Sequence, residues 1–181
     1  RDLRGSRRSR IVLGFVITAF AIGGYVLPTM QAAPTTADYA AFMVDIVALL
    51  VPLVGLLLGH RAIVGERASG RLNLLLSLPH GRRDVVVGKF LARTAALAAG
   101  VTGGVLLGSA LVDYPFGSFG AGTMLAYLLA TLLYGAAFVG IGIAISTATT
   151  SNAVATSAAF GVFFLFVAGW TQLRTVFATL L

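Results

Sequence analysis

Long apolar runs decide what this chain can fold into. A helix needs about 20 residues, and at least about 17, to cross the roughly 30 Å of hydrocarbon in a bilayer. Five segments are apolar over such a length: 11–27, 40–59, 90–112, 122–145 and 153–170. Because these runs do not alternate as transmembrane strands do, the sequence predicts an all-α integral membrane protein. We expect a single domain over residues 1–181, built on five transmembrane helices.

The cationic residues gather in two places. Five of the thirteen lie before residue 11 and seven lie in residues 60–93, whereas the expected loops 28–39 and 113–121 contain none. Cytoplasmic loops of membrane proteins are enriched in Lys and Arg. The distribution therefore predicts a multi-pass protein of the cell membrane, in contact with lipid, with its N-terminus in the cytoplasm. The net charge of +7 reports this topology and does not indicate a nucleic-acid partner.

Residues 60–89, between the second and third expected spans, form the most charged stretch of the chain. It contains leucines at helical spacing, then Pro79, which disfavours helix at the preceding residue. A helix is expected to restart at 81–84, where Asp84 meets the positive end of the helix dipole. We interpret this stretch as a cytoplasmic hairpin that docks on a soluble partner, with leucines in a groove and charges paired around it. A basic loop whose leucines lie on the headgroups is the alternative.

The residues expected at this docking surface are Gly65, Glu66, Arg67, Ser69, Gly70, Arg71, Leu72, Leu75, Leu76, Leu78, Pro79, Arg82, Arg83 and Asp84. Their order, Gly-Glu-Arg-x-Ser-Gly-x-Leu-x-Leu-Leu-Leu-Ser-Leu-Pro-x-x-Arg-Arg-Asp, resembles the loop between the second and third helices of ABC-2 type transporter permeases, especially their NosY-like branch. The sequence of elements from the basic N-terminal segment to the fifth expected span is also similar to that family.

The resemblance implies a transport subunit that is driven by a separate ATP-binding subunit. In that family the loop holds a coupling helix, which sits in a cleft of the ATP-binding subunit. ATP and Mg would bind to that partner, with no cofactor and no catalytic residue on this chain. The resemblance also implies six transmembrane helices and a pair of permease halves, identical or different. This chain is expected to be a permease truncated before its sixth helix.

Further residues are candidates for packing or for function inside the membrane. Asp45 is an acid within an apolar span, which makes it a functional candidate, although an interfacial acid in contact with water is equally expected. Stripes of small residues let helix backbones approach closely, inside one chain or between two copies. The two stripes are Gly100, Gly104 and Gly108 in the third span, and Ala136, Gly140 and Ala144 in the fourth.

Local signals add four expectations. Pro28 should end the first helix, because proline interrupts backbone hydrogen bonding. Ser151 or Asn152 should cap the fifth helix. Tyr39 should lie with other aromatic residues at the outer membrane boundary. Residues 171–181 have one apolar helical face, which predicts an amphipathic segment at the outer interface or the start of a sixth span.

Two other functions remain open from the sequence. The chain could be a membrane anchor or immunity-type subunit that docks an ATPase without transport, or an intramembrane enzyme. An enzyme would need metal-binding histidines or paired acids at membrane depth, yet His60 and His80 are far apart and lie in the hairpin. The sequence contains no GxxxxGK[ST] phosphate loop, so ATP hydrolysis is expected elsewhere.

Overall fold

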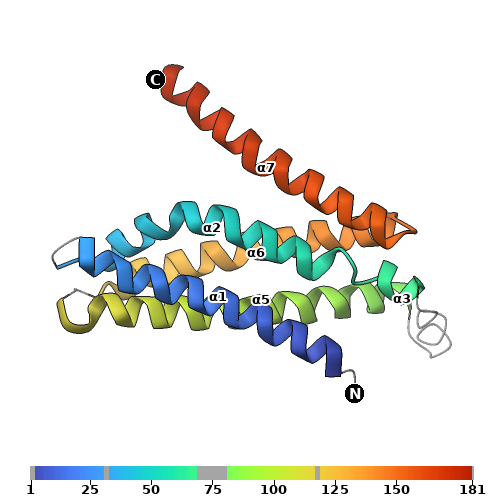
Figure 1. Cartoon of the computed structure of the whole chain (residues 1–181), viewed down its shortest axis with the longest axis horizontal. Coiled ribbons are helices and arrows are strands. Elements are labelled where there is room, and N and C mark those ends of the chain that lie inside the picture. Colours follow the sequence, from blue (N-terminus) through green and yellow to red (C-terminus); the bar gives the residue numbers. More distant parts are fainter. Residues whose placement is uncertain (1–2, 31–32, 69–80, 117–118, 181) are drawn as a thin grey trace. The chain divides into compact units, whose positions relative to one another are not determined.

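The computed structural model describes residues 3–30, 33–68, 81–116 and 119–180. These residues form helices and connecting turns, with no sheet, as expected from the apolar runs. The helices, in chain order in Figure 1, are α1 (Leu3–Met30), α2 (Thr36–Gly59), α3 (Val64–Ala68), α5 (Arg82–Phe116), α6 (Ala121–Ala148) and α7 (Asn152–Leu180).

Four stretches are long and apolar enough to cross a membrane. They are Ile11–Met30, Thr36–Arg67, Arg83–Val112 and Ala121–Ala148. The expected spans at 11–27, 40–59, 90–112 and 122–145 lie within these four stretches. The described apolar part of α7, Asn152–Val167, is shorter. The chain is therefore a multi-pass helical protein with four candidate spans, and a fifth span in α7 stays a prediction.

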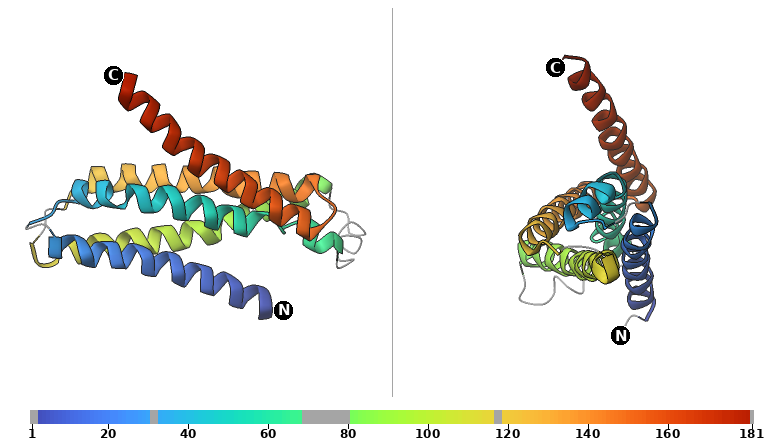
Figure 2. Two further views of the ribbon diagram at one scale, coloured as in Figure 1. Left: turned by 45° about the horizontal axis from the view of Figure 1, so that its top comes forward. Right: turned by 90° about the vertical axis from the view of Figure 1, so that its left-hand side faces the viewer.

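Helix α7 is one continuous element, which Figure 2 shows from two further directions. It runs from Asn152 to Leu180, so the expected span 153–170 and residues 171–180 of the expected amphipathic segment fall on the same helix. The cap predicted for its start is confirmed, because the Ser151 hydroxyl oxygen accepts the backbone N–H of Ala153 at 3.3 Å. Ser151 thus satisfies one of the amides that a helix start leaves without an intrahelical partner.

Two other helix starts have side-chain caps. At α2, the Asp38 carboxylate accepts the Thr35 backbone N–H at 2.8 Å, and the Thr35 hydroxyl oxygen accepts the Asp38 N–H at 3.2 Å. This reciprocal pair is a capping box. At α5, the Asp84 carboxylate accepts the Gly81 N–H at 2.9 Å. This confirms that the helix restarts within 81–84, with Asp84 in its first turn. The expected stop at Pro28 is wrong: α1 continues through it to Met30.

The described contacts divide the chain into two compact units. The first contains residues 1–51 and 94–136, and the second contains residues 52–93 and 137–181. Helices α2, α5 and α6 contribute residues to both units, whereas α1 belongs to the first and α7 to the second. The candidate site described below lies within the second unit.

In the first unit, α1 and α5 pack through glycines. A Cβ atom added to Gly24 would lie 2.2 Å from the Gly108 carbonyl oxygen, so both backbones meet at this point. Tyr39 of α2 is fully buried beside it and donates its hydroxyl proton to the Phe20 carbonyl oxygen at 3.1 Å. That Tyr39 lies at the membrane boundary stays a prediction, and the structure adds that its ring is buried between helices. A buried tyrosine needs a partner for its hydroxyl, and the α1 backbone supplies one.

In the second unit, the core joins α2, α6 and α7. Leu56, Phe138 and Ala159 form its buried cluster, one residue from each helix. A Cβ added to Gly142 would lie 3.0 Å from the Gly59 Cα, and one added to Gly59 would lie 2.7 Å from the Val139 carbonyl oxygen. The end of α2 therefore lies directly on the backbone of α6. This contact fixes the position from which the chain continues into residues 60–63.

Candidate functional site

The charged segment begins immediately after α2 and enters the short helix α3. A turn over residues 60–63 joins the two helices, with the Ala62 N–H bonded to the Gly59 carbonyl at 2.9 Å. Helix α3 then covers only Val64–Ala68. An isolated helix of this length is not stable in water, because nucleating a helix costs more free energy than the hydrogen bonds of a single turn recover. Its contacts with the longer helices must therefore hold it in place.

The strongest of these contacts comes from Ser146 of α6. Its hydroxyl oxygen accepts the backbone N–H of Ile63 at 2.9 Å and that of Val64 at 3.0 Å. Ser146 is fully buried, and Ile63 and Val64 are buried as well. A serine oxygen has two acceptor sites, so one side chain can satisfy both amides at the start of α3.

Arginine side chains on either side of this bond reach two further elements. Arg67 donates to the Thr149 carbonyl oxygen at 3.2 Å, directly after the end of α6. Arg61 donates to the Thr156 hydroxyl oxygen in the first turns of α7 at 3.3 Å. A cation beside the last carbonyls of a helix is favourable, because that end of the helix dipole is negative.

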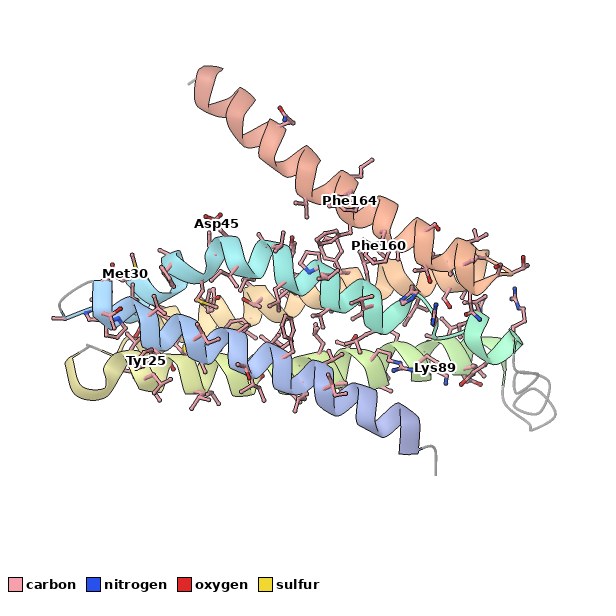
Figure 3. The ribbon with its side chains drawn as sticks, viewed as in Figure 1. Tyr25, Met30, Asp45, Lys89, Phe160 and Phe164 are labelled. Atoms are coloured by element: carbon pink, nitrogen blue, oxygen red, sulfur yellow. The ribbon has the colours of Figure 1, made fainter. Side chains whose placement is uncertain are left out.

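An ion pair joins α3 to α5. The Lys89 ammonium donates to the Glu66 carboxylate, and the two side chains are only 26% and 21% exposed. Figure 3 labels Lys89 on α5. Partial burial shields this pair from solvent more than a fully exposed pair, although the net stabilisation of such pairs is small. Helix α3 and the turn before it are thus bonded to residues of α5, α6 and α7 that lie within the second unit.

The structure places the expected docking residues as follows. Gly65, Glu66 and Arg67 lie on α3, Arg82 opens α5, and Arg83 and Asp84 are exposed in its first turn. Eight others fall outside the described residues: Ser69, Gly70, Arg71, Leu72, Leu75, Leu76, Leu78 and Pro79. The described part of the expected surface therefore lies at the start of α3 and at the start of α5.

The stripe expected in the third span lies against α1. Cβ atoms added to Gly100 and Gly104 would lie 3.6 Å from Val16 and 2.9 Å from Phe20, and Gly108 meets Gly24 as described above. These glycines therefore contact another helix of the same chain. Whether they also serve contact between two copies stays a prediction.

The small-residue stripe expected in α6 packs less closely against its neighbours than the stripe in the third span. Ala144 is exposed, Ala136 is partly buried, and a Cβ on Gly140 would lie at an ordinary 3.7 Å from Phe90. The close approaches of α6 occur instead at Gly142 and at Gly135, where a Cβ would lie 2.2 Å from the Leu97 side chain. Asp45 is exposed, and its side chain points outward from α2 in Figure 3.

Sequence reasoning missed the residues that fasten α3. Ser146, Thr149 and Thr156 come from the polar stretch around the link between α6 and α7, which the sequence explained as a helix cap alone. A signal was present, because Ser146 lies inside an apolar helix where a hydroxyl needs a partner. Among the described residues, no three His, Cys, Asp or Glu side chains gather as metal ligands.

Comparison with known proteins identifies the family. The model of the family described as "ABC-2 family transporter protein" matches residues 1–181, the whole chain. This chain belongs to the ABC-2 transporter family. The resemblance seen in the sequence of the charged hairpin is thereby confirmed.

Two relatives of this ABC-2 chain carry the same name, "Probable ABC transporter permease protein NosY". The protein from Pseudomonas aeruginosa is 34% identical over 131 residues, which cover 70% of this chain and 48% of the relative. The protein from Stutzerimonas stutzeri is 32% identical over 136 residues, with the same coverage of both chains. The chain therefore spans about half the length of the curated relatives it matches.

Proposed function

We propose that this ABC-2 chain is the permease subunit of a transporter driven by a separate ATP-binding subunit, which docks on the hairpin 60–89. ATP and Mg would bind to that partner, and this chain would contribute no catalytic residue. A second permease half, identical or different, would complete the transporter. Family membership and the name of the two relatives support the transport role.

The observation that carries the proposal is the fastening of residues 61–67, which are α3 and the turn before it, to three long helices. A partner that moves this segment also moves its bonded neighbours: Ser146 on α6, Thr156 on α7 and Lys89 on α5. A loop that only lay on lipid headgroups would not need buried bonds to distant helices. The contacts suit an element that transmits force from a docked protein to transmembrane helices.

The docking surface would combine charge and apolar contact. Arg83 and Asp84 are exposed at the start of α5, available to pair with charges on the partner. Leu75 belongs to the leucine-rich part of the hairpin, which would fill a groove of the partner in the helix-in-groove mode. A partner would drive transport only if it bound the two arrangements of the helices with different affinity.

Reconstitution with the candidate ATPase tests the proposal. The full-length permease and the ATPase would be placed in lipid vesicles, and association and ATP turnover measured. Leu75→Asp should weaken association about 30-fold, the factor for ~2 kcal/mol at an interface hot spot. Arg83→Glu should also weaken it, whereas Arg10→Glu, the same charge reversal on the N-terminal segment, should not.

Two outcomes contradict the proposal. If the ATPase associates equally well with Leu75→Asp and with the unmodified permease, the hairpin does not dock it. If docking depends on the hairpin but no substrate moves, the chain is an anchor that recruits an ATPase without transport.

The cytoplasmic position of the hairpin has its own test. The chain contains no cysteine, so a cysteine at Ser69 and one at Ser118 can be labelled separately in intact cells. With a cytoplasmic N-terminus, an impermeant reagent should label the cysteine at 118 and not the one at 69. The reverse pattern would invert the topology.

A further inference from the structure

An apolar groove lies between α2 and α7 in the second unit. Leu56 and Ala159, which are 2% and 5% exposed, form its floor. Leu57 and Phe160, each 43% exposed, form its walls, and Figure 3 labels Phe160 on α7. The groove is shallow and open on one side, and the roughly 220 Å³ of space within and above it is partly open to the surroundings. We call it the α2–α7 groove.

One end of the α2–α7 groove lies beside an arginine. His60 and Thr156 line the groove there, where α2 has just ended and α7 has just begun. The His60 Nδ1 lies 3.1 Å from the Leu56 carbonyl oxygen, and since a carbonyl can only accept, Nδ1 carries the proton. Arg61 is exposed at the same end, and its guanidinium donates to the Thr156 hydroxyl at 3.3 Å. A fixed positive charge therefore marks this end.

The walls of the groove are apolar, so an acyl chain is a suitable occupant. These walls belong to the apolar stretches Thr36–Arg67 and Asn152–Val167. An acyl chain can lie along Leu57 and Phe160, while a phosphate reaches the Arg61 guanidinium. The five N–H groups of an arginine match the oxygens of a phosphate in pairs.

We propose that the α2–α7 groove binds an anionic phospholipid, with an acyl chain between Leu57 and Phe160 and the phosphate at Arg61. The lipid would bridge α7 to the end of α2, next to α3. This lipid site depends on the chain being in a membrane and not on the docking of an ATPase. Basic positions between transmembrane helices are suited to anionic headgroups.

Native mass spectrometry of the full-length protein tests the site. The probes are phosphatidylglycerol and phosphatidylcholine with the same acyl chains, titrated into detergent. The unmodified protein should bind phosphatidylglycerol more tightly. Arg61→Gln should reduce that preference about fivefold, which is the contribution of one cation beside an anionic headgroup. Arg83→Gln removes an exposed arginine outside the groove and should leave the preference unchanged.

A second pair of variants tests the acyl-chain part. Phe160→Ala removes one wall and should weaken binding of both lipids, without changing the preference between them. Phe164→Ala, one helical turn further along α7 and 64% exposed, should weaken neither. Both residues are exposed, so neither truncation empties the buried core of the unit.

Three results would overturn the proposal. Equal binding of the two lipids by the unmodified protein would show that the groove has no headgroup site. If Arg61→Gln and Arg83→Gln reduced the preference for phosphatidylglycerol equally, the preference would come from the overall charge of the protein. Unchanged lipid binding in Phe160→Ala, together with disulfide-linked dimers of Phe160→Cys, would place a second copy of the chain in the groove.

Discussion

The substitution Ser146→Ala tests the fastening of α3 most directly. It removes the oxygen that accepts two buried backbone N–H groups, those of Ile63 and Val64. A buried donor that loses its partner costs about 1–3 kcal/mol, so the two together cost about 2–6 kcal/mol. Water that enters the site would recover part of this loss. We therefore expect α3 to open more easily by at least ~2 kcal/mol, which corresponds to about 30-fold.

Hydrogen exchange measures this opening. In the peptide that contains residues 60–68, Ser146→Ala should accelerate exchange by about 30-fold or more, because local opening controls exchange of buried amides. The free energy of unfolding of the whole protein should change less, since the loss is confined to α3. ATP turnover stimulated by the permease should fall with the same variant if α3 transmits movement.

Ser109→Ala is the matched control. Ser109 is also a buried serine in a helix, 6% exposed, but its hydroxyl donates to the Leu106 carbonyl of its own helix. Its removal leaves no backbone amide without an acceptor, so exchange of residues 60–68 should not change. Unchanged exchange in Ser146→Ala would refute the reasoning, because the two bonds would then not hold α3.

Three further substitutions have definite expected outcomes. Gly59→Ala places a Cβ 2.7 Å from a carbonyl oxygen of α6 and should lower the thermal midpoint in detergent by an overpacking cost of about 1–3 kcal/mol, whereas Gly161→Ala, with open space around it, should not. Tyr39→Phe removes a buried hydrogen bond to a carbonyl of α1 and should cost about 1 kcal/mol in the same assay; no loss would mean that the bond contributes nothing. Glu66→Gln should release Lys89 and cost at most about 1 kcal/mol, and the difference from the unmodified protein should shrink at high salt.

The sequence predicted those parts of the fold that depend on neighbouring residues. Apolar length located the candidate spans, and the charged first turn at Asp84 located the start of α5. The polar stretch at Ser151 located the start of α7. Each of these signals acts within a few residues, so it can be read without knowledge of the packing. Pro28 is an exception, because a proline can stay in a helix when the backbone groups it frees find other partners.

Packing between helices could not be predicted in the same way. The burial of Tyr39 was not predicted, because its hydroxyl bonds to a carbonyl of α1 that lies 19 residues earlier in the chain. The small residues of α6 form several overlapping stripes, and only the position of α2 decides that Gly142 makes the close contact. Ser146 bonds to residues 82 and 83 positions away, so its role required the structure.

The long separation between Ser146 and α3 also sets an order of assembly. The ribosome makes α3 before it makes α6, so for more than 80 residues of synthesis the amides of Ile63 and Val64 exist without their acceptor. Helix α3 can take its bonded position only after α6 has entered the membrane. If the proposed partner recognises the fastened α3, it binds late, because an unfinished chain does not present the proposed docking surface in full.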